Sequence, residues 1–178
     1  LLNLSAIAVS CGITQPTAKA WLSLLESSYI VFLLQPYYGN FNKRILKTPK
    51  LYFYDTGLVS YLLGIRNEKE IDTHPMKGGL FENLIVSEIQ KTDYHNYLMK
   101  DLWYWRDSNG NEVDLIIENK LKHDIIEIKA TQTVQSSAFT GLNYFSTIAP
   151  DFVKNKILIY GGDDSQKRTN YLVKSWKE

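Results

Sequence analysis

The chain has 178 residues, 44% of them hydrophobic and 22% charged, enough to fill one substantial core or two small ones. Its net charge of +1 gives no overall attraction to nucleic acid, so any DNA contact must rest on local patches. The single cysteine, Cys11, excludes an intramolecular disulfide and a multi-cysteine zinc site, and the longest apolar runs are too short to cross a bilayer. These properties predict a cytoplasmic protein with no membrane partner.

Residues 1–65 predict a winged-helix-like segment. Asn3 would cap a short helix that ends before Gly12, and Thr14 followed by a proline predicts the start of a second helix. The apolar residues expected to form the buried stripe of this second helix are Trp21, Leu22, Leu24 and Leu25. A β-branched and aromatic run over 29–34 would follow as the first wing strand.

The second helix of a winged-helix module reads a DNA groove, but here Lys19 is its only cation. Packing against another module or subunit is therefore the competing interpretation. A basic stretch follows, made of Lys43, Arg44, Lys47 and Lys50. It can hold phosphates or form a solvated wing or loop. Asp55 is expected to cap a short helix over 58–63.

The polar residues 66–79 predict a linker, and residues 80–178 predict a second domain. Its expected order is α-β-β-β-α-β: a helix over 80–91, strands over 102–106, 111–118 and 124–130, a helix over 136–147 and a strand over 156–160. A further edge strand is expected over 171–176. The fold class is therefore mixed α/β.

The strands over 111–118 and 124–130 alternate apolar and charged residues. A polar four-residue loop would pair Glu118 with His123, and hence Asp114 with Glu127 and Glu112 with Lys129. Facing carboxylates repel one another unless a cation lies between them. The pattern therefore predicts a magnesium (or manganese) site, because hard divalent cations prefer oxygen ligands.

A third carboxylate is expected from the helix over 80–91. Glu82 falls on the same helical stripe as Val86 and Ile89, where a residue facing the sheet should be apolar. A buried lone carboxylate is costly, so Glu82 needs a partner.

These residues resemble the PD-(D/E)XK restriction-endonuclease-like fold, with Glu82 on a helix, Asp114 on a strand and Glu127-Ile128-Lys129 on the next strand. The segments over 44–58, 79–84, 112–114 and 127–130 further resemble a domain of unknown function (DUF4143) that follows an AAA-type ATPase module in many prokaryotic proteins. The sequence has no Gly-x-x-x-x-Gly-Lys-Ser/Thr phosphate loop, so we expect a carboxy-terminal fragment whose ATP-binding module lies elsewhere in the polypeptide.

The resemblance implies metal-dependent phosphodiester hydrolysis acting on DNA. Asp114 and Glu127 would hold the metal, Glu82 would complete its shell, and Lys129 would position water or offset charge on the phosphate. Arg106, Asp107 and Glu112 border the strands and would touch the phosphate or a second ion. The partners implied are DNA, the ATPase module and further copies of the chain in an oligomer.

Two alternatives stay open at this stage. Charged residues often alternate with Ile or Val on half-exposed strands, so the cluster can be purely structural. A nuclease-like fold can also serve as a non-catalytic platform that binds nucleic acid, or as a protein-interaction module that regulates the ATPase.

Overall fold

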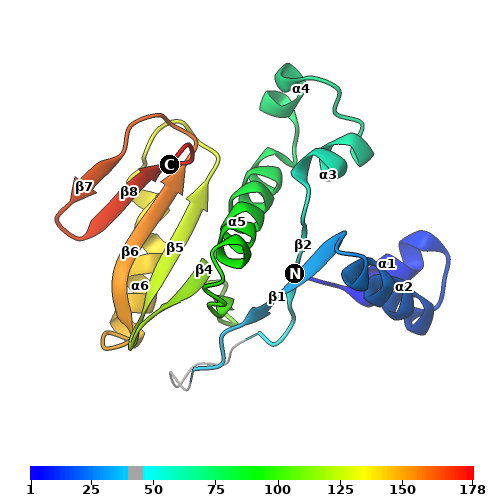
Figure 1. The fold of residues 1–178 in the computed structure, drawn as a ribbon, viewed down its shortest axis with the longest axis horizontal. Helices are drawn as coiled ribbons and strands as arrows, with labels where there is room; N and C mark the ends of the chain where they lie inside the picture. Colours follow the sequence, from blue (N-terminus) through cyan, green and yellow to red (C-terminus); the bar gives the residue numbers. More distant parts are fainter. Residues whose placement is uncertain (40–45) are drawn as a thin grey trace.

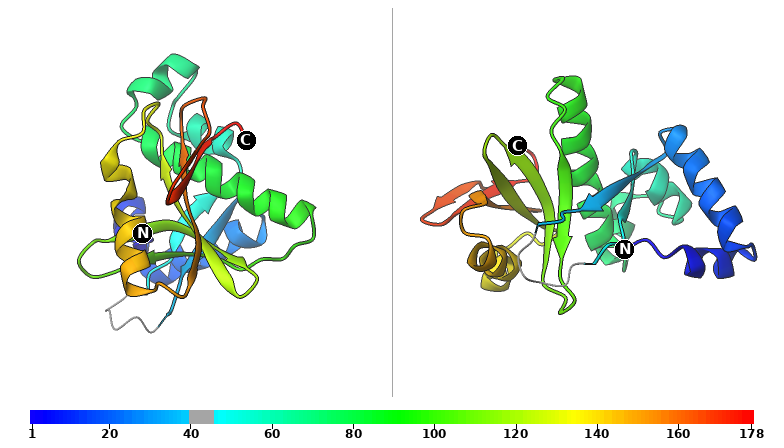
Figure 2. Two further views of the ribbon diagram at one scale, coloured as in Figure 1. Left: turned by 90° about the vertical axis from the view of Figure 1, so that its left-hand side faces the viewer. Right: turned by 90° about the horizontal axis from the view of Figure 1, so that it is seen from below.

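The computed structural model describes residues 1–39 and 46–178, and these form one eight-stranded mixed sheet flanked by helices (Figures 1 and 2). The strand order is β2-β1-β3-β4-β5-β6-β8-β7. The predicted α/β class is confirmed. No helix within the described ranges is long and apolar enough to cross a membrane.

The N-terminal helices begin and end where local sequence signals place them. The Asn3 side chain accepts a hydrogen bond from the Ala6 amide at 2.9 Å and caps α1 (Leu4–Cys11), which ends at Gly12 with φ of 65°. Thr14 caps α2 (Gln15–Ser27).

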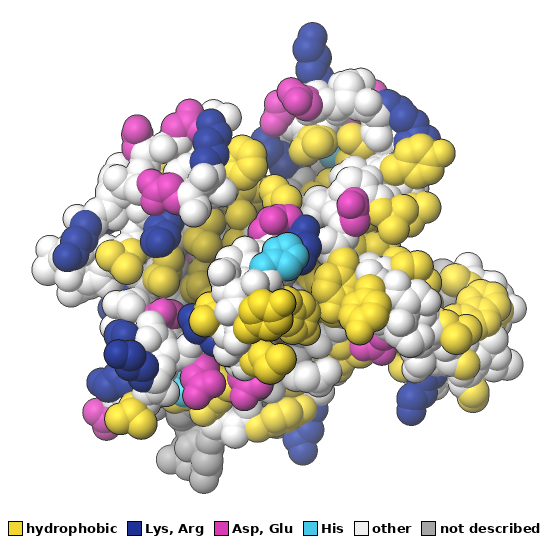
Figure 3. Space-filling model, in the orientation of Figure 1, with side chains coloured by type: hydrophobic (Ala, Val, Ile, Leu, Met, Phe, Trp, Pro, Cys, Tyr) yellow, Lys and Arg dark blue, Asp and Glu magenta, His cyan; other side chains and the backbone are white. Residues whose placement is uncertain are grey.

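The predicted buried stripe of α2 is wrong. Trp21, Leu24 and Leu25 are exposed, with 53% of the Trp21 surface accessible, and only Ala18 of this helix is buried. Apolar side chains accordingly lie on the surface of the N-terminal helices, at the right of Figure 3. The amphipathic pattern is real, but no other described element of the chain packs over this face of α2.

The N-terminal strands extend the sheet of the second half of the chain. β1 (Val31–Pro36) pairs antiparallel with β2 (Lys50–Phe53) and parallel with β3 (Leu102–Arg106). Side chains on β2 therefore lie close to residues that are far away in the sequence. The predicted cap at Asp55 is confirmed, since its carboxylate accepts from the Leu58 amide at 2.6 Å at the start of α3 (Thr56–Leu62). A short helix, α4 (Glu68–Thr73), lies within the predicted linker.

Two helical layers cover the two faces of the sheet. α5 (Lys77–His95) packs on one face, against a core that includes Leu115, Ile126 and Ile128. The short 3-10 helix η1 (Ser136–Phe139) and α6 (Thr140–Ile148) cover the other face, against Val113 and Ile125. The two apolar cores lie on opposite faces of β4 (Glu112–Asn119) and β5 (Lys122–Lys129).

The C-terminal strands differ from the prediction in one respect. β8 (Tyr171–Ser175) was expected at the edge, but it lies between β6 (Val153–Tyr160) and a short outer strand, β7 (Gln166–Arg168). β7 has only three residues, all exposed, and shows no hydrophobic alternation from which it could be predicted.

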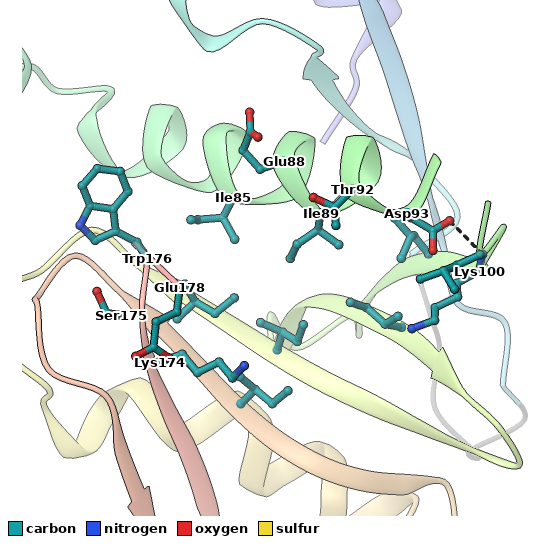
Figure 4. Close-up of a pocket in the computed structure, with 16 residues that line it drawn as sticks. Ile85, Glu88, Ile89, Thr92, Asp93, Lys100, Lys174, Ser175, Trp176 and Glu178 are labelled. Atoms are coloured by element: carbon teal, nitrogen blue, oxygen red, sulfur yellow. Dashed lines mark hydrogen bonds between the residues drawn. The ribbon is translucent and has the colours of Figure 1, made fainter. Parts of the chain in front are cut away.

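α5 does not cover its whole sheet face. A groove of about 360 Å³ separates the helix from β6 and β8, with Ile85 and Ile89 on the helix side and Trp176 at one end (Figure 4). Its floor is built from isoleucines of β4, β5 and β6. This apolar groove is separate from the charged cluster described below.

The predicted hairpin register is confirmed, since Glu118 lies opposite His123. The strict alternation predicted along β4 is wrong, because Trp103 of β3 pairs with Ile116 while Trp105 pairs with Val113. One extra residue of β4 therefore bulges between these pairs. As a result Leu115 packs on the α5 side and Val113 on the α6 side, although strict alternation would place both on one face.

The approach of α6 to β4 depends on Gly141. A Cβ atom at this position would lie 2.0 Å from the backbone oxygen of Glu112, which cannot move without disturbing the strand. We expect Gly141→Ala to lower the free energy of unfolding by about 1–3 kcal/mol, the usual effect of overpacking.

Urea unfolding followed by circular dichroism measures this difference. Gly78→Ala is the matched control, because a Cβ at Gly78 in α5 meets no atom within 4 Å. Alanine is the better helix former, so this control should hold or raise the stability. Equal stability of Gly141→Ala and the wild type would contradict the close packing of α6 on β4.

Candidate functional site

The candidate site begins where β4 and β5 separate. Their ladder ends at the pair Leu115 and Ile126, and the predicted pairing of Asp114 with Glu127 does not form. Instead, a carboxylate oxygen of Asp114 accepts a hydrogen bond from the Ile128 amide at 2.9 Å. The side chain of Asp114 thus takes the place of a backbone acceptor in the gap between the strands.

A lysine that was not predicted as a site residue lies among the carboxylates. The Lys50 ammonium on β2 is 2.8 Å from Glu82 and 3.4 Å from Asp114, and it also forms an ion pair with Glu112. Its side chain is only 11% exposed. Buried charges require such partners, so the predicted need of Glu82 for a partner is met by Lys50.

Glu82 is held from β2 by two groups. Tyr52 donates its hydroxyl to the same Glu82 oxygen that contacts Lys50, at 2.5 Å. Lys50 and Tyr52 point the same way because they are two residues apart on a strand. Next to Glu82, Asn83 binds the backbone of Phe53 through both its amide oxygen, at 2.7 Å, and its amide nitrogen, at 3.1 Å. These contacts join α5 to β2 over two successive helix residues.

The carboxylates of the site differ in the direction in which their pKa values are shifted. Burial by itself would raise the pKa of Glu82, but the charge of Lys50 and the hydrogen bonds from Lys50 and Tyr52 lower it below its usual value. Burial raises the pKa of Asp114 despite the nearby lysines. Burial also opposes the charge of Lys50, yet the surrounding acidic groups raise its pKa, so the ammonium stays protonated.

Glu127 is the least satisfied carboxylate of the site. It lies on the α6 side of β5, where Oε1 forms an ion pair with Lys129 and Oε2 is buried without a hydrogen-bond partner. Burial, followed by repulsion from Asp114, raises the pKa of Glu127 to about 7. Asp114 therefore links the group around Lys50 to the group formed by Glu127 and Lys129.

The four predicted catalytic residues, Glu82, Asp114, Glu127 and Lys129, are thus brought into one electrostatic cluster. Their arrangement differs from the predicted one, because Glu112 does not pair with Lys129. Glu112 lies opposite Arg106 and forms an ion pair with it at 3.1 Å. Lys129 lies opposite Tyr160 of β6.

A metal ion would need oxygen ligands that are free to bind it. Among residues 1–39 and 46–178, no group of three or more His, Cys, Asp or Glu side chains is arranged as a metal site. The Lys50 ammonium already lies between three carboxylates. The unpartnered oxygen of Glu127, close to Asp114, is the feature that fits a cation, since carboxylate oxygens are the ligands that magnesium prefers.

The residues predicted to contact nucleic acid come from different elements of the chain. Lys19 is exposed on α2 and Lys47 is exposed just before β2, whereas Arg106 faces Glu112. Lys43 and Arg44 lie outside the described residues. The amide of Leu46 donates to the carbonyl oxygen of Arg106 at 3.1 Å, so Lys47 lies beside Arg106, whereas Lys19 lies on a separate helix.

Lys50 and Tyr52 were missed as site residues, although the sequence carried a signal for them. In the segment Lys50-Leu51-Tyr52-Phe53, alternation places Lys50 and Tyr52 on one face, and both are buried. A lysine that points inward from a strand requires a carboxylate partner. What could not be foreseen is that β2 would join the sheet of the second half of the chain.

Fold and site together define a mixed α/β protein with a lysine–carboxylate cluster at the point where two strands separate. Residues 77–177 match the family described as a domain of unknown function (DUF4143), and residues 1–69 match one described as a domain of unknown function (DUF8612). The chain belongs to the DUF4143 family. The Lys50 strand thus comes from one matched region and the carboxylates from the other.

Similar full-length proteins occur in mycobacteria. The chain is 32% identical over 133 residues to uncharacterized proteins of Mycobacterium bovis (Mb2031c) and Mycobacterium tuberculosis (Rv2008c). These alignments cover 75% of the chain and 29% of each relative, so the chain spans less than a third of their length. No solved structure is significantly similar to the chain.

The raised pKa of Glu127 predicts a pH-dependent stability. Its pKa moves from the ordinary 4.5 to about 7, so the folded protein retains a proton that the unfolded chain releases in between. The contribution of this group to stability is full below pH 4.5 and is lost as the pH rises through 7. Glu127→Gln should remove about 1–3 kcal/mol of this pH dependence.

Urea midpoints measured from pH 4.5 to 7.5 test this expectation. Glu68→Gln, an exposed substitution on α4, serves as the control and should keep the wild-type profile. A Glu127→Gln profile as steep as that of the wild type would show that Glu127 is not the group responsible.

Proposed function

We propose that this chain is a PD-(D/E)XK nuclease-like module that hydrolyses phosphodiester bonds of DNA with the help of magnesium or manganese. The observation that carries the proposal is the convergence of Asp114, Glu127 and Lys129 at the point where β4 and β5 separate. Two carboxylates and a lysine are the side chains that hold a divalent cation and offset the charge of a phosphate.

In this proposal each side chain has a distinct role. Asp114 and Glu127 would hold the metal ion through their carboxylate oxygens, one of which, Oε2 of Glu127, is buried without a hydrogen-bond partner. The bound ion would supply a lowered pKa of coordinated water and a positive charge beside the phosphate. Lys129 would direct the attacking water or neutralise charge on the phosphate, because it already lies next to Glu127.

Glu82 would act through Lys50 rather than directly on the metal. Its oxygen is engaged by Lys50 and Tyr52, and its pKa is lowered accordingly. Glu82 would therefore hold Lys50 in place, while Lys50 balances the charge of Asp114 and Glu112 until a divalent cation enters. In this proposal the ammonium and the metal ion compete for one carboxylate, that of Asp114.

We further infer that the N-terminal segment is winged-helix-like and that an AAA-type ATPase module belongs to the same polypeptide. Two capped helices followed by the β1–β2 pair support the first inference. The length of the mycobacterial relatives leaves room for a further module and so supports the second. The exposed apolar face of α2 is suited to packing against such a module or another subunit.

A non-catalytic platform is the second candidate, and the position of Lys50 favours it. An ammonium that permanently satisfies Glu82, Glu112 and Asp114 would leave no need for a metal ion. Such a protein would bind DNA, or regulate the ATPase module, without cleaving a phosphodiester bond.

Metal binding distinguishes the two candidates. Titration of the chain with MnCl2 by calorimetry should show binding that Asp114→Asn weakens by at least about 10-fold, since a ligand is lost. Lys50→Met should bind Mn²⁺ more tightly than the wild type, because no ammonium competes with the ion for Asp114. Lys69→Met, at an exposed lysine on α4, is the control and should leave the isotherm unchanged.

Equally weak Mn²⁺ binding by the wild type, Asp114→Asn and Lys50→Met would contradict the catalytic proposal. Circular dichroism of each variant separates a lost ligand from a lost fold.

Cleavage is the direct test of activity. Incubation of supercoiled plasmid DNA with the wild type and Mn²⁺ should yield nicked and linear forms, whereas Glu127→Gln and Lys129→Met should reduce the product to background. A wild type that binds Mn²⁺ but leaves the plasmid intact would support the non-catalytic platform instead.

A further inference from the structure

The carboxylate site by itself is poorly suited to attract DNA. Four carboxylates, those of Glu82, Glu112, Asp114 and Glu127, face only three cations, those of Lys50, Arg106 and Lys129. Each of these cations is already paired with a carboxylate. Because most of the affinity of proteins for DNA comes from neutralising phosphates, a protein with this site needs unpaired cations elsewhere.

A cationic hollow of about 440 Å³ lies at the other end of the β5–β6 pair, lined by the start of β6 and by the turn that joins β7 to β8. Figure 1 shows β7 and β8 at the edge of the sheet. We use the term cationic hollow for the space lined by Lys154, Lys156, Lys167 and Arg168 together with Asn155, Thr169 and Asn170. No Asp or Glu is among the described residues that line it. The sequence hides this cluster, because its cations come from two separate strands.

The four cations of the hollow keep their charge available. Lys156 lies over the ring of Tyr171, with its ammonium 4.8 Å from the ring centre, and the Arg168 guanidinium lies 5.7 Å from the ring centre of Phe139. Aromatic rings orient such groups without neutralising them. Lys154 donates to the neutral amide oxygen of Asn119 at 2.7 Å. Within the part of the chain that the structure describes, none of the four forms an ion pair with a carboxylate.

The strand register separates the hollow from the carboxylate site. Lys156 lies opposite Ile125, whereas Lys129 lies opposite Tyr160, four residues further along both strands. At about 3.3 Å per residue this is roughly 13 Å along the sheet. Charge changes in the hollow can therefore be made without touching any member of the carboxylate site.

We propose that the cationic hollow binds the phosphate backbone of DNA and anchors the substrate of the carboxylate site. The inference rests on the proposed function in that it takes DNA as the ligand. Lysine, arginine, asparagine and threonine are among the side chains that contact backbone phosphates, and all four types line the hollow. Because these contacts do not read bases, the binding is independent of sequence.

Binding of a short fluorescein-labelled duplex, followed by fluorescence anisotropy at several KCl concentrations without divalent metal, tests the proposal. Lys156→Gln/Arg168→Gln should weaken binding by about 10-fold at low salt and lower the slope of log K against log [KCl] by about 2, one for each lost phosphate contact. Lys154→Gln/Lys167→Gln, at two exposed positions, should have a similar effect and does not disturb the ring contacts.

Lys69→Gln/Lys100→Gln removes the same charge from exposed positions outside the hollow and should leave the affinity and the slope unchanged. Equal losses in this control and in the hollow variants would overturn the proposal, as would hollow variants that bind like the wild type. Competition by poly-aspartate as effective as that by unlabelled duplex, at equal charge, would also overturn it in favour of an acidic protein partner.

The failure of this inference differs from a failure of the proposed function. Hollow variants should retain Mn²⁺ binding in the calorimetric titration, because no carboxylate has been changed. If these variants lose DNA binding and the wild type binds no Mn²⁺, the hollow is supported as a DNA site and the nuclease proposal is wrong. If the hollow variants bind DNA like the wild type and still bind Mn²⁺ and cleave DNA, only the proposal for the hollow is wrong.

Discussion

The buried ammonium of Lys50 is the constraint on which the rest of the structure depends. It lies among Glu82, Glu112 and Asp114 in a place where water is largely excluded, and each charge would be costly there without the others. These contacts join β2 to α5 and β4, so the N-terminal segment is held to the second half of the chain by charge as well as by the sheet. Removing either sign would leave the other uncompensated.

The separation of β4 and β5 determines which partners the carboxylates of Asp114 and Glu127 have. A bulge in β4 and the end of its ladder at Leu115 allow Asp114 to bind the Ile128 amide within the gap. Glu127 remains close by on the next strand, with one oxygen bound to Lys129 and the other without a partner. In a regular hairpin these two residues would have lain opposite each other on the ladder.

Much of the architecture could be predicted because it depends on local signals. Asn3, Thr14 and Asp55 cap the helices that they were expected to cap, and the turn after Glu118 sets the hairpin register. The bulge could not be predicted, since it arises from the pairing of β4 with β3 and not from the alternation within β4. The exposure of Trp21 was equally hidden, because periodicity identifies an apolar face but not what covers it.

The candidate site was predictable in its members but not in its arrangement. Glu82, Asp114, Glu127 and Lys129 were each singled out by a charge at a position where the pattern favours an apolar or paired residue. Lys50 was assigned to a basic stretch because sequence spacing does not reveal that β1 pairs with β3. β2 of the N-terminal segment therefore supplies the cation that the buried carboxylates of the second half require as a partner.

The most direct measurement of the central claim is anomalous scattering from a crystal of the chain grown with Mn²⁺. The account predicts an anomalous peak in the gap between Asp114 and Glu127, with the Lys50 ammonium moved away from Asp114 but still bound to Glu82. A crystal in which manganese appears only on the surface, and Lys50 remains between the three carboxylates, would contradict the account.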